Sequence, residues 1–398
     1  MLFRYMPEYL REDDSPTATN LTAAARELRP LIESEADGIE RNGTMSPPVV
    51  DALCDAGLFR LLVPEDLGGF EATPSTILDV CEELAFADGS VGWSFAQNTT
   101  VMAYSAYMAP EFARPLASAR AAAGMFAPLG MAHKEPDGFR VSGSFLFGSG
   151  CGHAEYMGGA AMEMHDGEMP PFVDDLPLLR AFIVPAAQTT IKSNWDVMGL
   201  RGTGSFDFDI PEQLVDPGQT FSIFDTAGIT GGPLYGLGPV PLGTISSVAW
   251  ALGVACRALH EIIQITTAGR ARMGSDPLRE QQIFQRDLGR HAKAIEAARL
   301  LAHEAYGSTV AAIAKGISKD ERKRLVRETR ATASYVVDVA KAATVFAYEA
   351  SGSSGLRNPS ILQRCFRDMY VGASHLVFDE RNYIEIAKTR LGLEPLPF

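Results

Sequence analysis

The change of residue pattern along the chain, from helix-like to strand-like and back, constrains the fold most strongly. Up to about residue 120 apolar residues recur at helical spacing, and the stretch 90–109 carries no charged residue. Between 121 and about 235 glycine, proline and β-branched residues increase and the apolar runs shorten, as in strands joined by turns. After residue 240 long stretches of helical periodicity return. The pattern predicts an α+β protein that is mostly α-helical.

We therefore predict three domains. The N-terminal α-helical domain covers residues 1–120, the middle β-domain covers 121–235, and the C-terminal helical bundle covers 236–398. The β-domain is expected to form a barrel or sandwich, and the C-terminal domain a four-helix bundle. The expected strands are GFRVSGSFLFGSG, YMGGAAMEM, LRAFIVPAA and GSFDFDI.

The starts of the helices are predicted from capping residues. Thr19 or Asn20 should cap the first helix, Ser46 the second and Thr73 the third. Each precedes an apolar-periodic stretch and has a side-chain oxygen that can accept a backbone N–H at a helix start. The last helix of the bundle should carry His375, near the end of the chain.

The composition is that of a soluble globular protein, with 46% hydrophobic residues, 21% charged residues and a formal net charge of -14. An acidic surface repels phosphate backbones, so nucleic acid is not an expected partner. The N-terminal sequence lacks a signal-peptide run, and no charge-free apolar stretch reaches about 20 residues, so no membrane contact is expected. The 5 cysteines are dispersed without a CxxC pair, which predicts reduced thiols, no metal site and a cytoplasmic location.

A short glycine-flanked segment is the first candidate for a binding site. Ser149 stands between Gly148 and Gly150, so the backbone can approach a flat ring closely while the serine hydroxyl donates or accepts a hydrogen bond. Trp195 offers a flat apolar wall. The same residues would also suit a plain β-turn and a core aromatic, and the local sequence leaves both interpretations open. No GxGxxG motif or Walker loop is present, so no nicotinamide site is expected.

Four motifs, in this order, carry a resemblance to a known family. They are LFRLLVPEDLGGF, VSGSFLFGSGCGHA, WDVMGLRGTGSFDFDI, and GRARMG followed by EQQIFQ. Together with the order of the domains they resemble the acyl-CoA dehydrogenase fold, from about Leu21 to Leu393. The resemblance implies a flavin site near subunit boundaries of a homotetramer. The residues implied to bind the flavin are Phe126, Ser149, Trp195, Thr203, Ser205 and Arg270.

The segment DMYVGASH, at 368–375, distinguishes between two branches of this fold. Acyl-CoA dehydrogenases commonly carry a stretch like YEGT here, whose glutamate takes the substrate proton. This chain has YVGA, and Val371 cannot accept a proton. Glu349 is an alternative carboxylate, but its place in the preceding helix indicates a surface charge. The neighbours Arg367 and Asp368 are expected to form a structural ion pair.

The stretch LQRCFRDMYVGASH is similar to the C-terminal pattern of two-component flavin-dependent monooxygenases of the group D type. His375 follows Val371 by four residues, one helical turn along the same face. Those enzymes receive reduced flavin from a separate reductase and form a C4a-hydroperoxide with O2. The resemblance gives catalytic roles to His375 and Ser149, the histidine as base or as hydrogen-bond partner. A histidine satisfied within the core is the plain structural interpretation.

The sequence thus predicts the oxygenase component of a two-component flavin-dependent monooxygenase. It should use reduced FMN, or FAD, to hydroxylate a small hydrophobic substrate that is aromatic or polycyclic. The resemblance places Trp93 and Asn98 at the substrate cavity, although both would also fit a helix core. The alternatives are an acyl-CoA dehydrogenase or related flavin oxidase, and a non-catalytic member that kept the fold.

Overall fold

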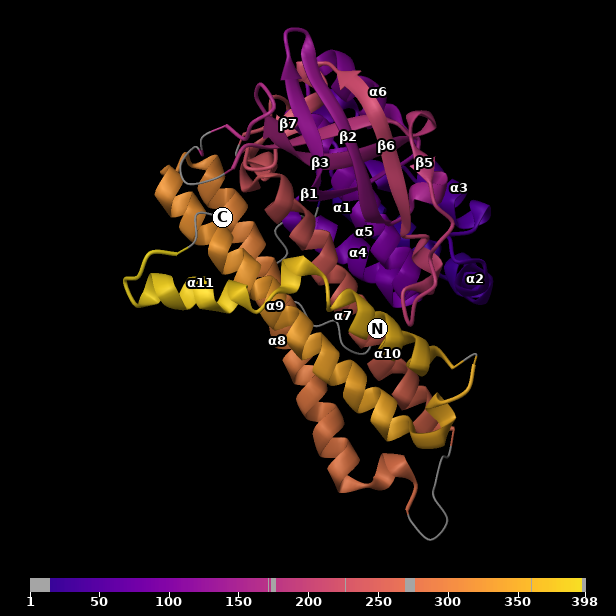
Figure 1. Cartoon of the computed structure of the whole chain (residues 1–398). Helices are drawn as coiled ribbons and strands as arrows, with labels where there is room; N and C mark the ends of the chain where they lie inside the picture. Colours follow the sequence, from indigo (N-terminus) through magenta and orange to yellow (C-terminus); the bar gives the residue numbers. More distant parts are fainter. Residues whose placement is uncertain are drawn as a thin grey trace.

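The structure, a computed structural model, describes residues 15–170, 172, 177–225, 227–268, 276–358 and 360–395. Helices precede and follow a strand-rich segment, so the chain is mostly helical with one large sheet, as predicted (Figure 1). The helices before the sheet are α1 (Pro16–Glu27), α2 (Arg29–Asn42), α3 (Pro47–Asp55), α4 (Pro74–Ala87), α5 (Gly89–Ala103) and α6 (Pro110–Ser118).

Two of the three predicted helix starts are confirmed, although the Ser46 hydroxyl makes no capping hydrogen bond. Ser46 occupies the N-cap position of α3, and the Thr73 hydroxyl caps α4. The predicted cap at Thr19 or Asn20 is wrong, because both residues lie inside α1. The Ser15 side chain caps that helix instead, since it accepts the amide N–H of the third helical residue.

Strands β1 to β7 form one sheet in the order β5-β6-β2-β1-β3-β4-β7. Only β1 and β3 run parallel, and the other neighbouring pairs are antiparallel. The strands are β1 (Ala122–Glu135), β2 (Gly138–Gly148), β3 (Tyr156–Met164), β4 (Leu179–Pro185), β5 (Thr190–Ile191), β6 (Phe206–Val215) and β7 (Thr220–Ser222). The four predicted strand segments correspond to β2, β3, β4 and β6. Whether the sheet is best described as a barrel or a sandwich stays a prediction.

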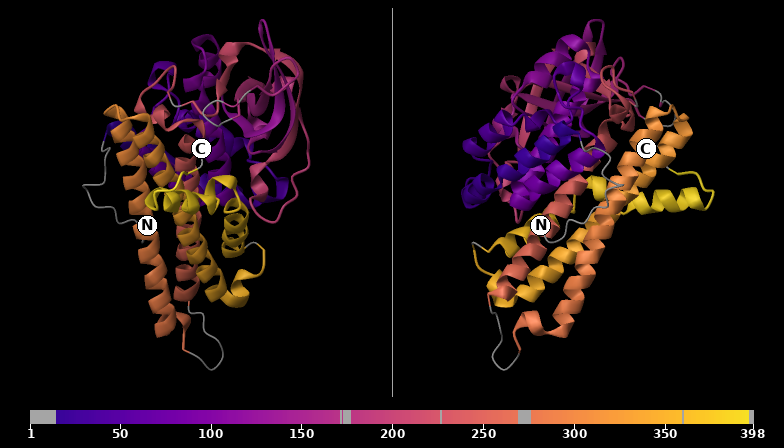
Figure 2. Two further views of the ribbon diagram at one scale, coloured as in Figure 1. Left: turned by 60° about the vertical axis from the view of Figure 1, so that its left-hand side comes forward. Right: turned by 180° about the vertical axis from the view of Figure 1, so that it is seen from behind.

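The C-terminal helices include three long ones that extend away from the sheet (Figure 2). They are α7 (Pro239–Thr267), α8 (Gln282–Ala314), α9 (Lys319–Ser351), α10 (Ile361–Gly372) and α11 (Arg381–Arg390). Among the described residues α7 alone has the length and hydropathy of a membrane span, and 94% of its apolar window is buried inside the protein. Its hydropathy is therefore accounted for by the core, where α7 packs against α4, α5, α9 and α10.

The prediction that His375 lies on the last bundle helix, one turn beyond Val371, is wrong. Helix α10 ends at Gly372, and His375 has an extended backbone, with φ -69° and ψ 141°, at the start of the next short 3-10 turn. The helix ends where the indole of Trp250 packs against it, since a Cβ at Gly372 would lie 2.1 Å from that ring. His375 therefore leaves the helix axis and turns toward α5.

Candidate active site

A chain of hydroxyl groups connects α5 to the turn after β2. The indole Nε1 of Trp93 donates to Ser149 Oγ at 3.2 Å, and Ser149 Oγ lies 2.7 Å from Ser205 Oγ. Ser205 Oγ lies 2.6 Å from Thr203 Oγ1, which donates to the carbonyl of Leu200 at 2.8 Å. All five residues are buried. The structure thus brings together four residues that the sequence predicted for the site and adds Leu200.

The two ends of this chain of hydroxyl groups fix the direction of the hydrogen bonds within it. The Leu200 carbonyl can only accept, so the single hydroxyl hydrogen of Thr203 is engaged there. Ser205 must then donate to Thr203, and Ser149 to Ser205. Ser149 Oγ already accepts from the Trp93 indole and has no hydrogen left to donate. Toward a ligand, Ser149 therefore presents a lone pair and acts as an acceptor.

The turn that carries Ser149 has a strained backbone. Phe147, a non-glycine residue, has a φ of 60°, and its side chain is 52% exposed. The amide of Ser149 donates to the Phe147 carbonyl at 2.8 Å, and the amide of Gly150 donates to the Thr203 carbonyl at 2.9 Å. A Cβ at Gly150 would lie 2.4 Å from Asn98 Oδ1, so this turn has no room for a larger residue. Contacts on both sides of Ser149 keep the backbone in this strained conformation.

The side-chain amide of Asn98 holds the turn at Ser149 in place. Its amide nitrogen donates to the carbonyls of Ala122 (2.9 Å) and Ser149 (3.0 Å), and its Oδ1 lies 2.9 Å from His153 Nε2. Because the amide oxygen can only accept, His153 carries its hydrogen on Nε2. Asn98 is fully buried among these partners, and its predicted contact with substrate stays a prediction. His153 was not predicted as a site residue, although it lies within the glycine-rich motif.

His375 lies directly beside this hydroxyl chain. Its ring packs edge-on against Trp93, with centroids 5.4 Å apart, and Trp93 packs against Trp250 at 4.9 Å. The amide of Val377 donates to His375 Nδ1 at 3.3 Å. Burial lowers the pKa of His375 to about 4, so the ring is neutral near pH 7. With Nδ1 as acceptor, the neutral ring carries its hydrogen on Nε2 and offers a donor there.

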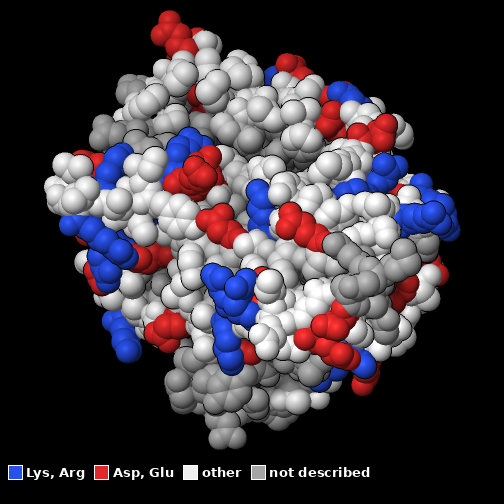
Figure 3. All heavy atoms as spheres, turned by 90° about the horizontal axis from the view of Figure 1, so that it is seen from below, with Lys and Arg blue, Asp and Glu red and all other residues white. Residues whose placement is uncertain are grey.

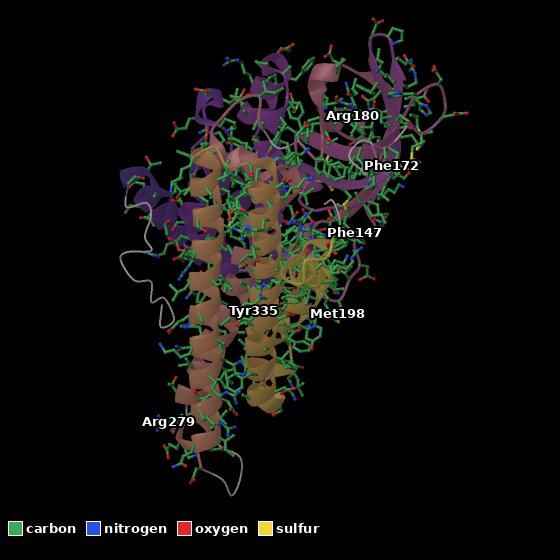
Figure 4. All side chains as sticks on the ribbon, turned by 90° about the vertical axis from the view of Figure 1, so that its left-hand side faces the viewer. Phe147, Phe172, Arg180, Met198, Arg279 and Tyr335 are labelled. Atoms are coloured by element: carbon green, nitrogen blue, oxygen red, sulfur yellow. The ribbon has the colours of Figure 1, made fainter. Side chains whose placement is uncertain are left out.

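Two of the remaining predicted flavin residues, Trp195 and Phe126, lie in the strand-rich segment. Trp195 is half-buried, donates to the Leu200 carbonyl at 3.0 Å and packs edge-on against Phe147 at 6.2 Å. In Figure 4 Phe147 and Met198 lie on the side where the strands approach the C-terminal helices. Phe126, on β1, packs edge-on against Tyr104 at 4.7 Å. Arg270 lies outside the described residues, so its contact with a flavin phosphate stays a prediction.

The carboxylates at this end of the chain have other tasks. Val371 packs partly buried against the core, and Glu349 is exposed on α9 in a shallow groove, as expected of a surface charge. The predicted ion pair between Arg367 and Asp368 is wrong. Arg367 pairs instead with Glu40 of α2 at 2.5 Å, and Asp368 accepts from the backbone amide of Leu200. Within the described residues no cluster of His, Cys, Asp and Glu is suited to a metal ion.

The donor and acceptor set fits a flavin ring. A reduced flavin presents N–H donors at its edge, and Ser149 offers the matching acceptor, while the half-exposed Trp195 and Phe147 supply apolar contact area. These residues would hold the ring next to the imidazole of His375.

Two histidines of the site, both partly buried, are expected to make the fold less stable in acid. Burial lowers the pKa of both His153 and His375 to about 4. Between about pH 6.5 and 4 the unfolded chain therefore binds protons that the folded chain does not, and stability falls as the pH falls. We expect each histidine to contribute on the order of 1 to 3 kcal/mol to this loss. Urea unfolding at a series of pH values should show a shallower loss in His153→Gln, and an unchanged slope would contradict the assignment.

Comparison with known proteins identifies the family. The sequence profile "Acyl-CoA dehydrogenase, N-terminal domain" matches residues 18–113, and "Acyl-CoA dehydrogenase, C-terminal domain" matches residues 245–380. Together they match more than half of the chain. The chain belongs to the acyl-CoA dehydrogenase family. In this structure both matched ranges are helical, and the segment between them contains the sheet.

Relatives within the acyl-CoA dehydrogenase family carry monooxygenase names. The chain is 26% identical to indole-3-acetate monooxygenase of Pseudomonas putida, over 94% of this chain and 97% of that protein. It is 28% identical to the flavin-dependent monooxygenase oxygenase subunit HsaA of Mycobacterium tuberculosis, with 95% and 97% covered. The crystal structure of HsaA matches with a TM-score of 0.84, at 25% identity and covering 95% and 98%. XiaF from Streptomyces, solved with FADH2, has a TM-score of 0.84 at 20% identity, covering 96% and 97%.

Proposed function

We propose that the chain is the oxygenase component of a two-component flavin-dependent monooxygenase. The observation that carries the proposal is the pair of residues in DMYVGASH: Val371 stands where a dehydrogenase needs a base, and His375 lies against Trp93 beside Ser149. The monooxygenase names of the relatives support this reaction over the dehydrogenase or oxidase alternative. Its substrate is a small hydrophobic aromatic or polycyclic compound, which the enzyme hydroxylates with O2.

A reduced flavin, FMN or FAD, supplies the electrons for oxygen activation when it is bound. The chain's own residues bind and orient the reactants. Ser149 accepts a hydrogen bond from the ring, and Trp195 provides an apolar wall. His375 donates through Nε2–H toward the space beside Trp93, rather than removing a proton there, because its Nδ1 is engaged and its pKa is low. The buried aromatic residues around it exclude water.

Several further features complete the proposal. Trp93 and Asn98 border the substrate cavity, and Arg270 binds a flavin phosphate. The three-domain division, the homotetramer, the separate reductase and the cytoplasmic location are expected of such an oxygenase. The end of the molecule seen from below has acidic and basic side chains interspersed, without a patch of one sign (Figure 3), which agrees with a small-molecule partner rather than nucleic acid.

The experiment that tests the reaction follows the oxygen atom. The purified protein is combined with a flavin reductase, NADH, FMN or FAD, and 18O2, and offered indole, phenolic and polycyclic aromatic compounds. We expect one 18O atom in each molecule of hydroxylated product. In a parallel anaerobic experiment acyl-CoA thioesters are added to the protein loaded with oxidised flavin. Bleaching of the flavin by a thioester, without any labelled product in the first experiment, would establish the dehydrogenase instead.

A further inference from the structure

The turn at Leu200 joins two predicted flavin residues, Trp195 and Thr203, at one backbone carbonyl. Leu200 is a non-glycine residue with a φ of 54°, and its side chain is 3% exposed. Its carbonyl accepts from Trp195 Nε1 at 3.0 Å and from Thr203 Oγ1 at 2.8 Å. Its amide donates to Asp368 Oδ1 at 2.5 Å. Such a backbone conformation is costly for leucine and persists only where its surroundings hold it.

Asp368 is fitted closely into this junction from helix α10. Its side chain is 2% exposed, and among the described residues its Oδ2 has no hydrogen-bond partner. Two glycines make room for it. A Cβ at Gly89 would lie 2.6 Å from Asp368 Oδ2, and a Cβ at Gly199 would lie 2.2 Å from the Arg367 carbonyl. A buried carboxyl with one unsatisfied oxygen is destabilising by itself, so a packing role alone does not explain it.

Charged groups of both signs face this carboxyl. Asp88 and Glu40 approach from α5 and α2, and Arg367 and Arg364 lie on α10 itself, with Arg364 Nη1 3.6 Å from Asp88 Oδ2. The thiol of Cys365 also lies near this carboxyl. Burial raises the pKa of Asp368 to about 7, with Asp88 adding to the rise, while the Leu200 amide and Arg367 lower it. The carboxyl therefore changes its charge near neutral pH.

We propose that Asp368 is a positioning residue for the flavin site. By holding the Leu200 amide it fixes the carbonyl that orients the Trp195 indole and the Thr203 hydroxyl. The fixed Thr203 hydroxyl in turn makes Ser149 an acceptor. Because His375 follows on the same segment as Asp368, this contact also fixes the flavin-facing loop relative to the imidazole. The catalytic part rests on the proposed function, whereas the positioning of Trp195 can be measured without flavin.

The test compares Asp368→Ala, which frees the Leu200 amide, with Asp368→Asn, which keeps an oxygen acceptor. The chain contains 3 tryptophans, and their indole N–H signals are recorded by NMR on the full-length, flavin-free protein labelled with 15N-tryptophan. We expect the Trp195 signal to shift most in Asp368→Ala and little in Asp368→Asn. Under anaerobic conditions the Kd for reduced FMN should rise about tenfold in Asp368→Ala and stay within about twofold in Asp368→Asn.

The pH dependence separates positioning from packing. In the wild-type protein the Trp195 signal should titrate with a midpoint near pH 7, and this titration should be absent in Asp368→Asn. The matched control is Asp88→Asn, which removes a neighbouring buried charge but leaves the Leu200 contact. It should keep the Trp195 signal in place and move the midpoint to lower pH.

If Asp368→Ala does not fold, Gly199→Ala replaces it, since its added Cβ pushes the loop away from α10. A Trp195 signal unchanged in the folded variant would overturn the proposal. Equal shifts in Asp88→Asn and Asp368→Ala would also overturn it, because a general packing effect would then suffice. A shifted Trp195 signal with no 18O incorporation in any variant, the wild type included, would instead contradict the proposed function alone.

Discussion

His375→Leu is expected to lower the rate of coupled product formation by about 100-fold or more. Leucine fills much of the same space beside Trp93, but it has no Nε2–H to donate. The affinity for reduced flavin should change by less than about threefold, since the ring contacts assigned to Ser149 and Trp195 remain. Product formation and flavin oxidation are measured together, so that uncoupled oxygen consumption is separated from hydroxylation.

His375→Gln distinguishes a donor from a base at this position. The glutamine amide can donate from near the place of Nε2 but cannot take up a proton. If His375 donates, this variant should retain product formation within about tenfold of wild type. The wild-type rate should also show no inflection from His375 near pH 6.5, because its pKa is about 4. A glutamine variant as inactive as leucine, with a wild-type inflection near neutral pH, would assign the role of base instead.

Arg299→Met is expected to destabilise the fold by about 3 to 5 kcal/mol. Arg299 on α8 and Glu82 on α4 are each 1% exposed and form two hydrogen bonds, at 2.9 and 2.6 Å. Arg299 also lies 3.1 Å from the sulfur of Cys256 on α7. Removing the arginine takes away the positive charge that Arg299 places against the buried Glu82 carboxylate, which costs far more than losing a surface pair. Urea unfolding at pH 7 measures the change in the free energy of unfolding.

Two comparisons make this result specific. The double variant Glu82→Met with Arg299→Met removes both charges and should recover most of the lost stability, because apolar side chains of similar volume fill the site. The control Arg286→Met breaks an exposed pair with Asp287, 2.9 Å apart, and should cost less than about 1 kcal/mol. A loss of stability in Arg299→Met no larger than in this control would show that the buried pair is not stabilising.

The sequence predicted local features of the fold well where their cause is local. Thr73 and Ser46 precede clear apolar periodicity, and both mark real helix starts. The predicted caps at Thr19 or Asn20 and at Ser46 imply a single helix between them, but Pro30 lies in the first turn of α2, and α1 ends before it. Proline has no N–H to extend the preceding helix, so the break has a local cause that the apolar periodicity concealed.

The site was predictable only in part, for a physical reason. The hydroxyl groups of the site lie in two short motifs, one with Ser149 and one with Thr203 and Ser205. The family resemblance placed both motifs at one ligand. The contact of Asp368 with Leu200 joins residues 168 positions apart and depends on how α10 packs against the loop. The direction of His375 depends in the same way on the fit of Trp250 against Gly372. No spacing in the sequence encodes such contacts.

The burial of α7 affects how the chain can be synthesised and divided. This helix packs against α4 and α5 of the N-terminal region and also against α8, α9 and α10, so one hydrophobic core spans both helical regions. A chain emerging from the ribosome cannot close its N-terminal core until residue 267 has been made. Until then the apolar faces of α4 and α5 stay open to water or to chaperones. Cleavage near residue 236 would leave two fragments, and each would lack the part of the shared core that the other supplies.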